Sequence, residues 1–164
     1  MRRLLACLTF SLIASGCSHL YAKIGVHPFL VAERRVWCGS SWKLSFYSDG
    51  RAEQVTEYNC TRPHHSTRTL WLGNEFVLSL QSRLKQAEFF SLPSTLESDT
   101  FAADEDRISI TAWSRGLEHS VSVEGLDRTS TLPEVHRFLL VWSAAEAASG
   151  VEPAMPSQWP WPAM

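Results

Sequence analysis

The sequence lacks the excess of positive charge that a nucleic-acid-binding surface requires. Its 164 residues include 15 lysines and arginines against 17 aspartates and glutamates, which gives a formal net charge of -2. It also lacks the glycine-rich phosphate loops, the zinc-protease helix and the nucleophile elbow that mark common classes of enzyme. No nucleic-acid partner is therefore expected, and no motif assigns a cofactor or a catalytic residue.

The sequence also has no apolar run long enough to cross a bilayer, which takes about 20 helical residues. The run from Leu4 to Ala14 follows the cations Arg2 and Arg3 and leads through small residues into Cys17. This order is typical of an export signal rather than of a permanent anchor helix. We therefore expect residues 1–16 to be a cleaved signal peptide.

The segment Ala14-Ser15-Gly16-Cys17 resembles the lipobox of bacterial lipoproteins. The resemblance implies cleavage before Cys17 and acylation of this cysteine, palmitate included, which would hold the mature protein on a membrane. Ser18, where some lipoproteins have aspartate, implies by the same resemblance a lipid anchor in the outer membrane, facing the periplasm. The alternative is an ordinary cleaved signal that leaves Cys17 as an unpaired thiol.

Cysteine is scarce, with four residues in the chain. Cys7 leaves with the signal and Cys17 is the expected lipidation site, so Cys38 and Cys60 remain in a compartment that permits disulfides. We expect these two to pair. The alternative is a metal site, but the neighbouring pair His64-His65 does not have the spacing of zinc ligands, and we expect no metal.

The turn between the two cysteines determines their register. A two-residue Asp49-Gly50 turn would place Cys38 and Cys60 on opposite faces and would put carboxylates on the apolar face. With a three-residue loop, Ser48-Asp49-Gly50, paired residue numbers sum to 98, and the cysteines lie directly opposite each other. We therefore expect the three-residue loop.

Alternation of apolar and polar residues predicts strands within 41–58, 67–72, 107–113 and 118–123. Apolar residues at helical spacing predict one helix that begins near Asn74 and ends before Pro93. The sequence Thr131-Leu132-Pro133-Glu134 has the form of a capping box and predicts a second helix, which runs to about Ala148.

These elements predict the α+β class, with an antiparallel sheet of two hairpins plus extra strands and two amphipathic helices packed on one face. We expect a single domain over residues 29–148. A tether over residues 17–28 precedes it, and a tail rich in proline and tryptophan follows over residues 149–164.

Two motifs resemble a group of small exported bacterial lipoprotein domains of unknown function. They are the turn Tyr47-Ser48-Asp49-Gly50 and the helix end Phe89-Phe90-Ser91-Leu92-Pro93. The resemblance covers about residues 31–148. It implies an architecture and export, and it implies no activity.

Tryptophan is abundant, with seven residues. Trp37, Trp71 and Trp113 stand opposite to the apolar parity of their segments, which predicts a second, partly apolar sheet face. Two interpretations stay open. The terminal segments of the chain cover this face, or it binds an envelope protein or a polysaccharide.

We therefore expect a membrane-anchored envelope lipoprotein with a non-enzymatic binding or interaction module. The alternative is a small periplasmic enzyme, hydrolase-like, in which His119 or His64 acts with a nearby carboxylate. His119 shares the strand parity of Val121 and Val123, which favours a structural role for it. A deep cleft with a histidine beside a carboxylate would favour the enzyme, whereas a flat face with lone histidines would favour binding.

Overall fold

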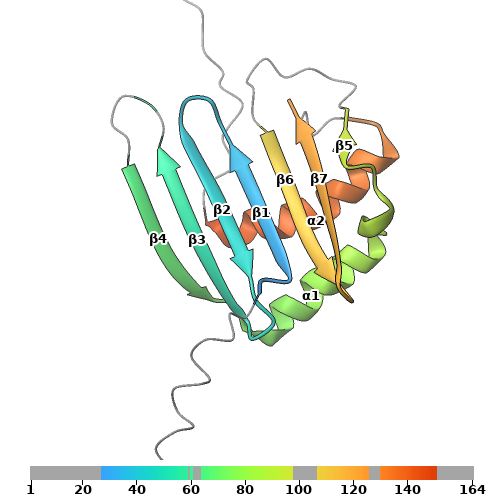
Figure 1. The fold of residues 1–164 in the computed structure, drawn as a ribbon, viewed down its shortest axis with the longest axis horizontal. Helices are drawn as coiled ribbons and strands as arrows, with labels where there is room; N and C mark the ends of the chain where they lie inside the picture. The colour runs from blue at the N-terminus through green and yellow to red at the C-terminus, as the bar shows by residue number, and fades with distance from the viewer. Residues whose placement is uncertain (1–26, 59, 61–63, 98–106, 126–129, 151–164) are drawn as a thin grey trace, which may run out of the picture.

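The computed structural model describes residues 27–58, 60, 64–97, 107–125 and 130–150. They form a seven-stranded sheet and two helices (Figure 1). The elements are β1 (Leu30–Arg35), β2 (Ser40–Phe46), β3 (Arg51–Tyr58), β4 (His64–Trp71), α1 (Gly73–Gln86), the 3-10 helix η2 (Phe89–Ser91), β5 (Thr95–Leu96), β6 (Arg107–Ser114), β7 (Leu117–Glu124) and α2 (Pro133–Ser149). The predicted signal peptide, Cys17, nearly all of the tether and the tail beyond Gly150 lie outside the described residues.

The sheet is mixed, so the expected antiparallel sheet of two hairpins plus extra strands is wrong. The strand order is β4-β3-β2-β1-β6-β7-β5, and β5 runs parallel to β7 with Thr95 opposite Ser122. This parallel pair forms because the chain leaves η2 in extended form after Pro93 and pairs with the outer edge of β7, where Ser122 N–H donates to the Ser94 carbonyl at 2.9 Å. At the other edge, the antiparallel pair β3–β4 extends the sheet.

The strand β1, which the sequence analysis did not predict, lies in the middle of the sheet. Its residue Leu30 is opposite Phe46 of β2 on one side and opposite Ala112 of β6 on the other. Leu30 and Ala32 are completely buried. The apolar half of this strand is short and runs into Glu33-Arg34-Arg35, so its alternation is weak in the sequence.

The predicted register of the β2–β3 hairpin is confirmed. Phe46 lies opposite Ala52, so paired numbers sum to 98, and the Tyr47 N–H donates to the Arg51 carbonyl across a three-residue loop. The disulfide Cys38–Cys60 is present, with its Cα atoms 5.2 Å apart. Gly50 closes the loop at φ +89°, and a Cβ at this position would lie 3.1 Å from the Gly73 backbone, so glycine is required twice over.

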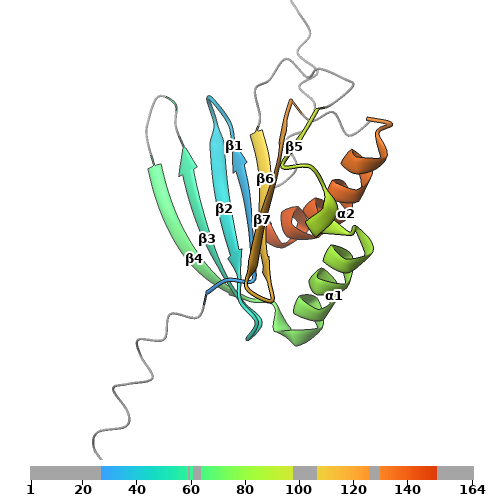
Figure 2. The same ribbon diagram turned by 45° about the vertical axis from the view of Figure 1, so that its right-hand side comes forward.

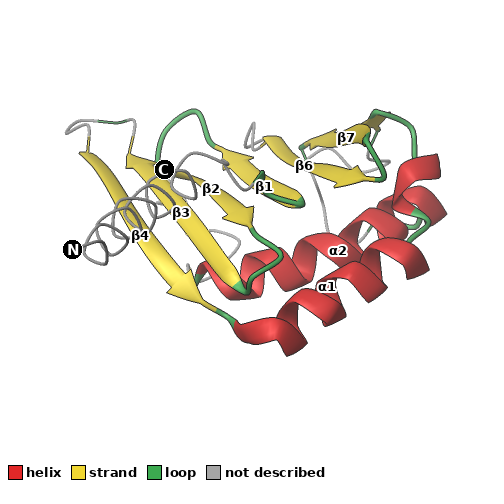
Figure 3. Ribbon diagram, turned by 60° about the horizontal axis from the view of Figure 1, so that its bottom comes forward, coloured by secondary structure: helices red, strands yellow, loops and turns green. Residues whose placement is uncertain are grey.

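Both helices cover the same face of the sheet (Figure 2). No other described element covers the opposite face, which we call the open face. They lie side by side beneath the strands (Figure 3). Helix α2 buries Phe138 and Trp142, and the Trp142 ring stacks on Trp42 of β2 with centroids 5.1 Å apart. Burial of each such side chain is worth about 1.5–3 kcal/mol, so α2 is a main source of stability.

The helix starts differ slightly from the prediction. Helix α1 begins at Gly73, one residue before the expected cap Asn74. Helix α2 begins at Pro133 with Leu132 at the N-cap, one residue later than the N-cap Thr131 that the capping box predicted. Proline in the first turn suits the start of α2, because the first N–H groups of a helix have no partner within it.

Reduction of the Cys38–Cys60 bond should lower the free energy of unfolding by about 3 kcal/mol. The bond joins residues separated by 22 positions, and this closure removes chain entropy from the unfolded state. Urea unfolding followed by tryptophan fluorescence, with and without a reductant, measures the change. A Cys38→Ser/Cys60→Ser variant serves as the control and should not respond to the reductant. An unchanged midpoint after complete reduction of the bond would contradict this expectation.

Candidate binding surface

The open face of the sheet carries the side chains that alternate with the buried ones. Val31, Ser45 and Thr111 are half-buried near its middle, and Glu53 lies directly opposite Ser45 in the same row. The Thr111 hydroxyl donates to the Ser120 hydroxyl across the β6–β7 pair at 3.1 Å. The middle of this face is therefore largely polar, as is common for the outer face of an antiparallel sheet.

Aromatic residues line one end of this face. In β4, Trp71 pairs with Arg51 of β3, and the Arg51 guanidinium lies 4.0 Å from the centroid of the Tyr47 ring. The Phe29 N–H donates to the Phe46 carbonyl at 2.9 Å, and the Phe29 carbonyl accepts the Trp113 N–H at 3.0 Å. We call Trp71, Tyr47, Phe29 and Trp113 the aromatic row. It crosses four strand spacings, or about 19 Å.

Hydrogen bonds and charges hold the middle of the aromatic row. The Tyr47 hydroxyl donates to a Glu53 carboxylate oxygen at 2.9 Å. Burial and this hydrogen bond raise the pKa of Tyr47 above its ordinary value of 10.0, so the phenol stays protonated and keeps donating. Arg51 forms ion pairs with Glu53 and with Asp49, which fix its guanidinium over the tyrosine ring.

The structure places two of the three tryptophans predicted to form a surface at the same end of the open face, four strand spacings apart. Trp71 and Trp113 share the aromatic row, and the Trp71 side chain is 73% exposed, whereas Trp113 is half-buried. Trp37 is 85% exposed but lies in the β1–β2 loop, at the opposite end of the sheet beside Cys38. Alternation along the strands predicted that Trp71 and Trp113 lie on the open face. It could not place Trp37, because Trp37 lies in a loop.

A polar hollow of about 360 Å³ lies on the other half of the open face. Its lining consists of two arginines, one glutamate and five hydroxyl residues: Arg35, Arg107, Glu33, Ser94, Thr95, Ser109, Ser120 and Ser122. The two arginines are directly opposite each other in the β1–β6 pair. The hollow was missed in the sequence because β1 and β5, which both contribute to it, were missed.

The charges of the hollow are balanced. The Arg35 Nε lies 2.5 Å from a Glu33 carboxylate oxygen, and this hydrogen bond and the carboxylate charge raise the pKa of Arg35. Arg107 lies 3.8 Å from Glu124. Two opposed arginines repel each other, and each acid offsets one of them. The hollow therefore offers many hydrogen-bond donors and acceptors with little net charge.

A second hollow, of about 390 Å³, lies along α2 and is more apolar. Its lining includes Leu139, Leu140 and Trp142, with His136 at one side. The His136 Nε2 lies 2.6 Å from the Ser130 carbonyl, to which it donates. This hydrogen bond connects the first turns of α2 to the segment that precedes the helix.

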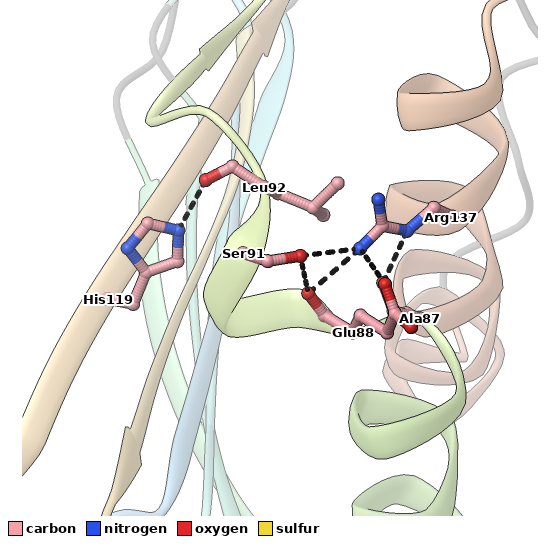
Figure 4. A network of polar contacts seen from close by, with 6 residues as sticks. All are labelled: Ala87, Glu88, Ser91, Leu92, His119 and Arg137. Atoms are coloured by element: carbon pink, nitrogen blue, oxygen red, sulfur yellow. Dashed lines mark hydrogen bonds and ion pairs between the residues drawn. The ribbon is translucent and has the colours of Figure 1, made fainter.

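His119, the main catalytic candidate, is engaged in the fold. Its Nε2 donates to the Leu92 carbonyl at 2.9 Å (Figure 4). Its ring also packs against Phe89, with centroids 5.6 Å apart. Arg137 of α2 holds the same corner by donating to the carbonyls of Ala87 and Glu88. These bonds satisfy carbonyl groups at the end of α1 that have no partner within the helix.

The other candidate histidines lie on the edge strand β4. His64 and His65 are exposed, and the His65 Nδ1 lies 3.7 Å from a Glu57 carboxylate oxygen. Both side chains of this pair are more than half exposed, on a flat strand pair rather than in a cleft. Within the described ranges, no group of three or more histidine, cysteine or acidic residues is placed to hold a metal ion.

A scan against models of known protein families finds no match to this chain, and a search of curated proteins finds no significant match. Interpretation of the surface therefore depends on its geometry and on the sequence.

Replacement of His119 by leucine should lower the free energy of unfolding by about 1–2 kcal/mol, because the Leu92 carbonyl loses its donor. Glutamine can place an amide N–H near the position of Nε2, so His119→Gln should cost less than His119→Leu. Thermal or urea unfolding of the two variants measures the difference. Equal stability of both variants and the wild type would show that the hydrogen bond contributes nothing.

Proposed function

We propose that this chain is a lipid-anchored lipoprotein of the bacterial envelope whose domain is a non-enzymatic binding module. The open sheet face, with its polar hollow, is the proposed binding surface. The observation that carries this proposal is that α1 and α2 both cover the opposite face, so these strands present their outward side chains to the surroundings (Figure 2).

The chemistry of the hollow favours a polysaccharide of the envelope as the ligand. Serine and threonine hydroxyls both donate and accept hydrogen bonds, and the two arginines and Glu33 add charged donors and acceptors. A sugar presents hydroxyl groups of the same two kinds without a net charge.

The Cys38–Cys60 disulfide supports export, because such bonds persist in oxidising compartments and are rare in the bacterial cytoplasm. In the parts of the chain that the structure describes, neither helix is long and apolar enough to cross a membrane. The proposed mode of attachment is acylation of Cys17, which the lipobox resemblance implies.

The enzymatic alternative has less support. His119 and His136 are engaged with backbone carbonyls. Among the described residues, the pair of His65 and Glu57 is the nearest approach to a histidine–carboxylate site, and it lies open to solvent on a strand edge. A general base works within hydrogen-bond reach of a positioned substrate, and this flat edge offers little to position one.

Replacement of Cys17 by serine should release the protein from membranes into the soluble fraction, because the acyl attachment is lost. Cell fractionation with immunoblotting measures this, and mass spectrometry of the wild type should show a mature chain that begins at Cys17 and carries the lipid mass. Cys7→Ser is the matched control and should leave the protein on the membrane. A wild-type protein whose N-terminus is free and unmodified would refute the anchor.

Filling the polar hollow should abolish ligand binding. We expect Ser109→Trp to weaken retention on isolated envelope polysaccharide by about tenfold or more, which corresponds to about 1.4 kcal/mol. Ser79→Trp, on the exposed side of α1, is the matched control and should bind like the wild type. If Ser109→Trp still binds the polysaccharide but no longer binds an envelope protein that the wild type binds, the domain is a binding module whose ligand is that protein. The polysaccharide would then be refuted as the ligand. Equal binding by all three chains would overturn the proposed surface.

A further inference from the structure

We propose that the end of the sheet that carries the aromatic row docks on the surface of the membrane to which the protein is anchored. The inference rests on the proposed lipid anchor at Cys17. It identifies which end of the domain contacts the lipid headgroups and so fixes how the domain is oriented.

Several turns lie together at this end of the sheet. The β2–β3 loop and the β6–β7 turn both lie at its lower edge in Figure 1. The junction of β4 with α1 lies against the β2–β3 loop, since the Leu72 N–H donates to the Gly50 carbonyl. The described chain also begins here, because Phe29 pairs with Phe46 and Trp113 at the same end. We call this end, with its turns, the aromatic end.

The aromatic end exposes apolar side chains that have no cover among the described residues. Trp71, the last residue of β4, is 73% exposed, and Leu117, the first residue of β7, is 67% exposed. Tyr47 and Trp113 add two half-buried aromatic rings. Tryptophan and tyrosine concentrate at membrane–water interfaces because their rings combine an apolar body with a polar group.

The proposed anchor leaves the domain from this same end. Nine residues separate Cys17 from His27, so the tether spans at most about 35 Å when it is fully extended. The far end of β1 lies about 20 Å beyond Phe29, six residues along the strand. A short tether gives the aromatic end a high effective concentration at the lipid surface, so that even weak contacts become populated.

Charge does not drive this docking. The aromatic end carries Arg51 and Arg115 together with Asp49, Glu53, Glu75 and Glu118. The ion pairs of Arg51 with Asp49 and Glu53 use its charge within the protein. The attraction must therefore come from insertion of Trp71 and Leu117, and it should not require anionic lipid.

Tethering that does not depend on natural acylation tests the docking. An oligohistidine tag in place of residues 1–17, which lie outside the described fold, attaches the domain to phosphatidylcholine vesicles that contain a nickel-chelating lipid. An environment-sensitive fluorophore is placed on Arg115→Cys at the aromatic end, or on Glu124→Cys at the other end of β7. Brominated phosphatidylcholine quenches a fluorophore that enters the lipid.

We expect a blue shift and quenching for the label at position 115 and neither for the label at position 124. The double change Trp71→Ser/Leu117→Ser should abolish the effect at position 115. Trp37→Ser is the matched control, because Trp37 is at least as exposed but lies at the opposite end, and it should leave the effect intact. The altered side chains are exposed, so the folds should persist, and circular dichroism checks this.

Three results would overturn the docking: no response at position 115, a response at position 124 instead, or a response that appears only with anionic lipid. A blue shift at position 115 that grows with protein concentration and is not quenched by brominated lipid would show contact with a second copy of the protein. That result would also overturn the proposed docking. The outcome is independent of the natural anchor. If the tagged domain docks but Cys17 of the wild-type protein carries no acyl group, only the proposed anchor is refuted.

Discussion

The arrangement of the molecule depends on the pairing of β1 on both of its edges. This strand joins the β2–β3–β4 half of the sheet to the β6–β7–β5 half, and Leu30 aligns Phe46 with Ala112 through it. The buried side chains Leu30 and Ala32 fix which face of β1 lies under the helices. Alternation then places Glu33 and Arg35 on the open face. One strand therefore aligns the core and also supplies two of the residues that line the polar hollow.

Local patterns predicted the parts of the fold that depend on neighbours in sequence. The register of the β2–β3 hairpin followed from one loop length, the parity of its carboxylates and the opposition of Cys38 and Cys60. The helices followed from apolar spacing, although their first residues did not, because Leu132 rather than a capping side chain precedes α2. The strand β5 has two residues and exists only through its pairing with β7, so no local pattern could predict it or the mixed sheet.

The candidate surface shows the same division. Parity along β4 and β6 placed Trp71 and Trp113 on the open face, since alternation needs only the strand itself. The polar hollow needs Arg35, Ser94 and Arg107 to meet, and these residues are brought together by the strand order rather than by their spacing. The parity of His119 favoured a structural role, but parity could not identify its hydrogen-bond partner, the Leu92 carbonyl, which lies in the segment between η2 and β5.

The two ends of the open face differ in a way that relates anchoring to binding. Exposed apolar groups lie at the end where the described chain begins, whereas the hollow lies toward the other end, near Arg35 and Arg107. The length of β1 separates these regions by about 20 Å. If the aromatic end rests on the membrane, the hollow stands clear of the lipid headgroups and faces the envelope space. A ligand such as a polysaccharide could then reach the hollow without competing with the membrane, so the same sheet can serve both contacts.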